Sequence, residues 1–195
     1  MQPLLTISIP TTIDRQESFT TLLNELTYQI TENDLEDIVV VDWECDDKEM
    51  SVGVKRDLLY KRAKGEYCWQ IDSDDFIDSN AIKLVYDALQ TAPDCVTFRE
   101  LCTINGDILH GNFSLQYDDW HDNPPGFNHA RTPFFKTPIR TDLCQQVGVA
   151  DMRWGEDHDF AIRIKPLLQT EVYIPVDIYH YIHWSTEHNE RYGIK

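Results

Sequence analysis

Residues 65–75 of this chain, GEYCWQIDSDD, place three carboxylates directly after a short run that favours a β-strand. The run is Tyr67–Ile71, and the carboxylates belong to Asp72, Asp74 and Asp75. Two carboxylates about 4 Å apart repel by ~1 kcal/mol in water and by ~4 kcal/mol at an effective dielectric near 20. A cluster at a strand end therefore favours a nearby cation, and oxygen ligands select Mg²⁺ or Mn²⁺. Because Asp and Ser are also common in solvated turns, the cluster alone leaves that second interpretation equally open.

Short apolar runs alternate with helical patterns through the first half of the chain. Three runs are typical of strands buried on both faces: Leu4–Ile9, which stops at Pro10, Ile38–Val41, which ends at Asp42, and Tyr67–Ile71. Apolar residues at helical spacing predict a helix that carries Phe19 to Ile30, a second over Gly53–Ala63 and a third over Ser79–Leu89. This alternation predicts an α/β protein with a mainly parallel central sheet flanked by helices.

The polar residues after these runs fall where a parallel sheet binds its ligands, at the carboxyl ends of the strands. Thr11 and Thr12 follow the first run, Asp42 the second, and the acidic cluster the third. We therefore expect them to share one crevice. The chain has neither a G-x-G-x-x-G pattern nor a P-loop pattern, so those two nucleotide-binding motifs are not supported.

The second half of the chain has a different pattern. Val96–Thr103 and Ile108–Leu115 flank Asn105-Gly106, which predicts a small antiparallel hairpin. Residues 117–138 are rich in Pro, Gly, aromatic and His residues, and we interpret them as a long binding loop. A short helix is expected over Arg140–Val147, and one or two strands over Glu171–Trp184, with Pro175 between them.

Composition limits the classes of function. The 195 residues fit one domain, and 34 acidic against 17 basic residues give a formal charge of −17. That charge disfavours nucleic acid as a partner without excluding it. No apolar run reaches the ~20 residues of a membrane span, and no signal-peptide pattern begins the chain, so we expect a cytoplasmic protein. The cysteines are odd in number and form no C-x-x-C pair, so neither a disulfide framework nor a zinc cluster is indicated. A reducing compartment is the simpler interpretation for the five: Cys45, Cys68, Cys95, Cys102 and Cys144.

Four sequence blocks, in order, resemble the family 2 glycosyltransferases of the GT-A fold. They are SIPTTIDR at 8–15, VGVKRDLLYKRAKGEY at 52–67 running into IDSDD, WGEDHDFAIR at 154–163, and YIH at 181–183. The resemblance covers most of the chain. It implies a single Rossmann-like GT-A domain over residues 1–195, in which residues 1–100 bind the nucleotide-sugar and residues 101–195 bind the acceptor and carry the catalytic base.

The resemblance also implies a divalent ion, Mn²⁺ or Mg²⁺, on the diphosphate of the donor. Asp74, with Asp75 nearby, matches the metal-binding end of the family's D-x-D motif, and Asp72 and Ser73 match its nucleotide side. His183 matches a late histidine that completes the metal or diphosphate site. His180 is a rival, and strand alternation would put the two histidines on opposite faces. For either histidine, a structural hydrogen bond is an equally good explanation.

Seven further residues match positions that contact the nucleotide in the family: Pro10, Thr11, Thr12, Arg15, Asp42, Lys55 and Arg56. For Lys55 and Arg56 the competing interpretation is a solvated helix face. One departure concerns the base. After Asp42 the family commonly has Asp-Gly-Ser, whereas this chain has Trp43, Glu44 and Cys45, so the base contacts are expected to differ.

Glu156 and Asp157 match the family's Glu-Asp pair, in which the Asp is the general base that draws a proton from the acceptor hydroxyl. Both acids could instead sit at a helix N-terminus, where negative charge is favourable without catalysis. Trp154 is placed to stack on the acceptor sugar or to pack in the core.

Taken together, these features predict a metal-dependent transferase that moves a sugar from a nucleotide-diphosphate donor, expected to be a UDP-sugar, to an acceptor hydroxyl with inversion. Two alternatives stay open: a nucleotidyltransferase acting on a sugar phosphate, and a non-catalytic module that binds nucleotide-sugars. The residues identify neither the sugar, the acceptor nor the oligomeric state.

Overall fold

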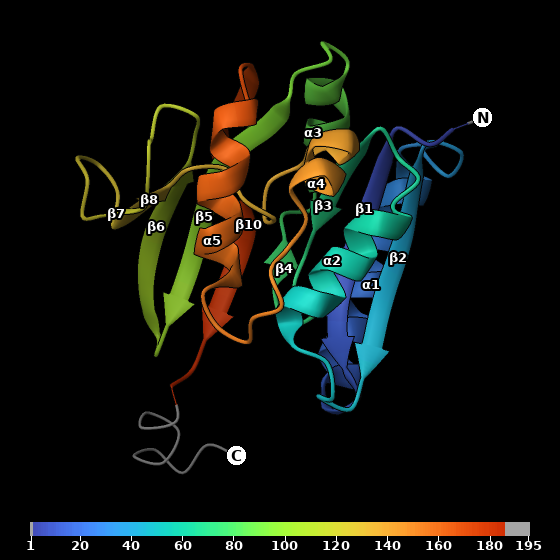
Figure 1. Cartoon of the computed structure of the whole chain (residues 1–195). Coiled ribbons are helices and arrows are strands. Elements are labelled where there is room, and N and C mark those ends of the chain that lie inside the picture. Colours follow the sequence, from blue (N-terminus) through green and yellow to red (C-terminus); the bar gives the residue numbers. More distant parts are fainter. Residues whose placement is uncertain (1, 186–195) are drawn as a thin grey trace.

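The computed structural model of the chain describes residues 2–185 and shows a mixed α/β structure around one ten-stranded sheet (Figure 1). The strands are β1 Leu5–Thr12, β2 Val39–Asp46, β3 Tyr67–Gln70, β4 Phe76–Ile77, β5 Cys95–Ile104, β6 Asp107–Phe113, β7 His121–Asp122, β8 His129–Arg131, β9 Ile139–Arg140 and β10 Glu171–His183. The α-helices in this part of the chain are α1 Gln16–Glu32, α2 Val52–Arg62, α3 Ala81–Leu89, α4 Thr141–Val147 and α5 Glu156–Ile164.

The sheet is parallel at its centre, as predicted. Its order is β2-β1-β3-β9-β5-β6-β8-β7, and β10 pairs with both β5 and β4. Strand β1 runs parallel to β2 and β3, and β10 runs parallel to β5. The short strand β9 is antiparallel to β3 and β5, so these two run in the same direction. The carboxyl ends of β1 and β3 therefore lie at the same edge.

Helices cover both faces of this sheet. Helices α2, α4 and α5 contact one another on the near face in Figure 1, whereas α1 packs against α3. The core between them is apolar and aromatic, and its largest fully buried side chain is Trp69 of β3. Its ring meets Phe98 of β5 edge-on at 6.0 Å. No helix within residues 2–185 has the length and apolar character that a membrane crossing requires.

The predicted hairpin is confirmed. Strands β5 and β6 pair in antiparallel register from Arg99↔Asn112 to Ile104↔Asp107. The connecting residues Asn105 and Gly106 have φ values of +53° and +91°. Positive φ at both central residues is what a tight hairpin turn of this type requires, and Asn-Gly supplies it at low cost.

Two predicted strand ends were wrong. Strand β1 continues through Pro10 to Thr12, and β2 continues past Asp42 to Asp46. The backbone N–H and C=O groups of even-numbered residues in β1 point toward β3, since Ser8 O accepts from Ile71 N. Because β3 itself ends at Gln70, the missing N–H of Pro10 breaks no ladder bond.

The second half is also more regular than its sequence suggests. Residues 117–138 hold the short strands β7 and β8 within the predicted loop. Residues 171–183 form one strand, and a register shift between Ile174 and Asp177 accommodates Pro175.

Asp94 ties the start of β5 to the start of β10. Its Oδ2 accepts from the N–H groups of Gln169 (2.8 Å) and Thr170 (2.9 Å) and from the Thr170 hydroxyl (3.1 Å). Burial alone would raise the pKa of Asp94, but these hydrogen bonds outweigh it and hold the pKa below its usual value.

We expect Asp94→Asn to lower the free energy of unfolding by about 1–3 kcal/mol at pH 7, because hydrogen bonds to a charged acceptor are weakened. Since the folded pKa is depressed, this contribution is present above the unfolded pKa of about 3.9 and is lost as pH falls through the folded pKa. Urea unfolding at pH 7 and at pH 3 measures the loss of unfolding free energy at each pH. Asp37→Asn, at an exposed position, is the control. An equal loss at both pH values would contradict the assignment.

Candidate functional site

A cavity of about 1000 Å³ opens at the carboxyl ends of β1 and β3. Twelve of the residues predicted to be functional line it: Pro10, Thr11, Thr12, Arg15, Lys55, Arg56, Asp72, Asp74, Trp154, Glu156, Asp157 and His183. The fold therefore brings the acidic cluster after β3 and the acidic pair of α5 to one cavity.

Three predicted residues do not line the cavity: Asp42, Ser73 and Asp75. Because β2 runs on to Asp46, Asp42 lies within the strand, and its Oδ2 accepts from Arg62 Nε at 2.6 Å. The acid at the actual end of β2 is Asp46, which forms a buried ion pair with Lys55. Ser73 is buried beside the acidic cluster.

Asp75 is buried, unlike Asp72 and Asp74, which line the cavity. Its Oδ2 accepts from the Tyr179 hydroxyl at 2.6 Å and lies 3.8 Å from Lys136 Nζ. Burial raises the pKa of Asp75 to about 7, against the opposing effect of Lys136. This placement separates the two carboxylates that the sequence assigned jointly to a metal.

Arg56 of α2 connects the two acidic segments. Its Nη2 donates to Asp72 Oδ1 at 2.8 Å, its Nε lies 3.4 Å from Glu156 Oε1, and its guanidinium lies 3.3 Å from the centre of the Phe135 ring. The side chain of Arg56 is only 4% exposed. The alternative of a solvated helix face is therefore excluded for Arg56.

Lys55, the preceding residue on α2, holds the end of β1. Its Nζ donates to Thr11 O at 2.8 Å in addition to the ion pair with Asp46. Lys55 is buried, so it too is not part of a solvated face. Together, Lys55 and Arg56 connect helix α2 to three strand ends of the sheet.

Asp74 lies at the cavity surface, with its side chain 41% exposed. Its Oδ1 accepts from Arg15 Nη1 at 2.9 Å. Burial, followed by the nearby charge of Asp72, raises the pKa of Asp74, and Arg15 opposes this effect. Such a carboxylate is accessible to a cation.

The pair Glu156-Asp157 begins α5, directly after Gly155, whose φ is +79°. Glu156 is buried; burial raises its pKa, and Arg56 opposes the rise. Asp157 is partly exposed, and its Oδ1 accepts from His158 N at 2.8 Å. The two adjacent acids thus differ in environment, because Glu156 is held by Arg56 whereas Asp157 faces the cavity. Trp154, 88% exposed, stands at the rim.

The two candidate histidines of β10 are separated by the strand. His183 lines the cavity, and its ring stacks on that of Tyr181 at 6.1 Å. His180 does not line it; its Nε2 lies 2.9 Å from Thr103 Oγ1, and burial lowers its pKa. Of the two, only His183 is placed to act in the cavity.

A further buried cation, Lys136, was missed from the sequence. Lys136 Nζ donates to Glu100 Oε2 at 3.0 Å and lies 4.1 Å from the centre of the Tyr181 ring. Lys136 and Glu100 are both buried, and both line the cavity. The available signal was one lysine among apolar residues in PFFKTP and one inward-facing acid in a strand.

Comparisons with known proteins place the fold. No protein-family model matches the chain, and no curated protein matches its sequence. Solved structures of S. aureus TarS do match. For TarS residues 1–349, the TM-score is 0.65 at 18% identity, over 92% of this chain and 60% of that one. The chain shares a fold with TarS.

Two further TarS structures agree. The same fragment in complex with UDP-GlcNAc matches with a TM-score of 0.66 at 17% identity, over 96% of this chain and 60% of that one. The complex with UDP matches with a TM-score of 0.65 at 18% identity, over 96% of this chain and 62% of that one. The chain thus spans about 60% of the TarS fragment, and at this identity the likeness concerns the fold alone.

We expect Arg56→Met to lower the free energy of unfolding by about 3–5 kcal/mol, because it leaves Asp72 and Glu156 without their buried counter-ion. Lys61→Met on the same helix is the matched control. Lys61 is exposed, pairs with Asp57 four residues earlier, and should change stability by no more than about 0.5 kcal/mol. Denaturant unfolding compares the two variants, and equal effects would refute the role given to Arg56.

Proposed function

We propose that this chain is a nucleotide-sugar-dependent glycosyltransferase with a GT-A domain, of which residues 186–195 lie outside the described part. The observation that carries the proposal is the shared cavity, in which Asp72 and Asp74 from one segment face Glu156 and Asp157 from another. The fold likeness to TarS structures that contain UDP or UDP-GlcNAc supports a donor of this class.

The charge of the cavity suits a diphosphate. Although the chain carries a formal charge of −17, seven basic residues line this one cavity: Arg15, Lys48, Lys55, Arg56, Arg131, Lys136 and Arg153. Six acidic residues line it too, so the cavity has a slight positive balance within a strongly acidic chain. A local balance of this kind attracts a negatively charged substrate against the overall field. We assign the donor diphosphate to the region of Arg15 and Asp74, near the end of β1.

We extend the proposal to a divalent ion on the donor diphosphate. Asp74 offers carboxylate oxygens and His183 an imidazole nitrogen, and both line the cavity, a donor pair that suits Mn²⁺ better than Mg²⁺. Asp75 is not part of this set, because its carboxylate is buried against Tyr179. When bound, the ion would act as a Lewis acid that offsets negative charge developing on the diphosphate.

We assign the role of general base in sugar transfer to Asp157. The acceptor oxygen attacks the anomeric carbon, the bond from that carbon to the diphosphate oxygen breaks, and Asp157 takes the proton of the acceptor hydroxyl. Direct displacement of this kind inverts the anomeric centre. Glu156 is a positioning residue, since its carboxylate is held by Arg56.

We expect Asp157→Asn to reduce kcat by about 10²- to 10⁴-fold, the usual contribution of a general base, with donor affinity within about twofold of wild type. Asp159→Asn is the matched control, because Asp159 is an acid of the same helix that pairs with Arg163 and does not line the cavity. Calorimetry measures donor affinity, and the rate of nucleoside diphosphate release measures kcat. Unchanged turnover in Asp157→Asn would eliminate Asp157 as the base.

A donor panel tests the reaction class and the metal together. With UDP-sugars and Mn²⁺ or Mg²⁺ we expect release of nucleoside diphosphate, and a chelator should abolish it. In Asp74→Asn the rate of release should fall at least about tenfold, because the variant loses a charged metal ligand. Release of pyrophosphate from a nucleoside triphosphate and a sugar phosphate would instead indicate a nucleotidyltransferase. Donor binding without any release would indicate a non-catalytic module.

A further inference from the structure

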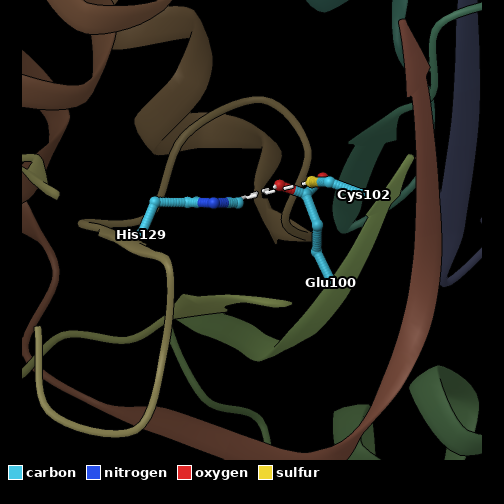
Figure 2. A group of neighbouring side chains, drawn as sticks. All are labelled: Glu100, Cys102 and His129. Atoms are coloured by element: carbon cyan, nitrogen blue, oxygen red, sulfur yellow. Dashed lines mark hydrogen bonds and ion pairs between the residues drawn. The ribbon is translucent and has the colours of Figure 1, made fainter. Parts of the chain in front are cut away.

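Three further potential ligands line the same cavity as Asp74. Glu100 and Cys102 come from β5 and His129 from β8, and Figure 2 shows their side chains pointing toward one another. One ligand atom from each lies within 4.8 Å of the others. Residues two apart on a strand share a face, which explains how Glu100 and Cys102 converge.

We propose that Glu100, Cys102 and His129 form a binding site for a transition-metal ion of the Zn²⁺ type, with one coordination position open to the cavity. His129 Nε2 lies 3.0 Å from Glu100 Oε1 and 4.0 Å from Cys102 Sγ. Around a tetrahedral Zn²⁺, ligand atoms lie about 3.3–3.6 Å apart, given metal–ligand distances of about 2.0–2.3 Å. The two observed separations bracket this range, so small side-chain rotations would complete the site.

The surroundings of these ligands hold them in place. The two carboxylate oxygens of Glu100 have different partners. Oε2 accepts from Lys136 Nζ at 3.0 Å, and Oε1 faces His129. An outer contact of this kind orients a metal-binding carboxylate. His129 is paired in register with Gly111 of β6, where an added Cβ would lie 2.1 Å from Nε2. The missing side chain of Gly111 is thus what makes room for the imidazole.

The chemistry of the set selects the metal. A thiolate and an imidazole favour Zn²⁺ or a similar ion over Mg²⁺, which prefers oxygen ligands alone. On binding, the Cys102 thiol would release its proton to solvent and coordinate as thiolate. Three protein ligands with a fourth position open is the pattern of reactive rather than purely structural zinc sites. The ion would also fasten β8, and with it the segment 117–138, to β5.

Cobalt(II) is a direct test, because a Co²⁺–thiolate bond gives a charge-transfer absorption that oxygen ligands do not. We expect reduced, metal-free protein to bind one Co²⁺ per chain with this absorption, and one equivalent of Zn²⁺ to displace it. Cys102→Ser should lose the absorption and His129→Gln should weaken binding at least about tenfold. The exposed Cys45→Ser should keep both properties.

Two further measurements keep the result decisive. Asp74→Asn should retain the absorption, which distinguishes this site from the metal proposed on the donor diphosphate. The inference is then independent of the proposed function. Zn²⁺ should raise the Tm of wild type but not that of His129→Gln, a readout that needs no Cys102 variant if that variant folds poorly. The proposal is overturned if wild type shows no saturable absorption, or if the absorption survives in Cys102→Ser.

Discussion

The buried guanidinium of Arg56 is the interaction on which the site depends. It lies between Asp72, which follows β3, and Glu156, which begins α5, and these acids are far apart in the sequence. Without the cation, two carboxylates would face each other in a region where charge is poorly solvated, and their repulsion would drive the segments apart. Arg56 therefore keeps the acid assigned to the nucleotide and the neighbour of the proposed base on one cavity wall.

Lys136 has a corresponding role in the same cavity. It pairs with Glu100 and lies near Asp75, and the rings of Tyr179 and Tyr181 enclose its ammonium group. Burial raises the pKa of Asp75, and Lys136, which lies closer to Glu100, offsets this only in part. Arg56, Lys55 and Lys136 are thus buried cations that line the cavity, each compensated by carboxylates. This arrangement explains how a strongly acidic chain maintains a region with concentrated basic residues.

Helix α5 shows how one short element separates two similar residues. Glu156 and Asp157 are adjacent, and both lie in the first turn, where the helix dipole favours negative charge. The turn directs Glu156 inward to Arg56 and leaves Asp157 toward the cavity. The dipole and a catalytic role are therefore compatible explanations, and burial distinguishes the two acids.

The sequence predicted the order of elements, the parallel centre of the sheet, the Asn105-Gly106 hairpin and twelve of the residues that line the cavity. Each of these depends on local periodicity, on turn chemistry or on motifs contiguous in the chain. The ends of β1 and β2 could not be predicted, since strand pairing carried them past Pro10 and Asp42. The partners of Arg56, the inward turn of Asp75 and the meeting of Lys136 with Glu100 were decided by tertiary structure alone. A contact between distant residues depends on which strands lie side by side, and burial, not residue type, determines whether a charge is solvated or must find a partner.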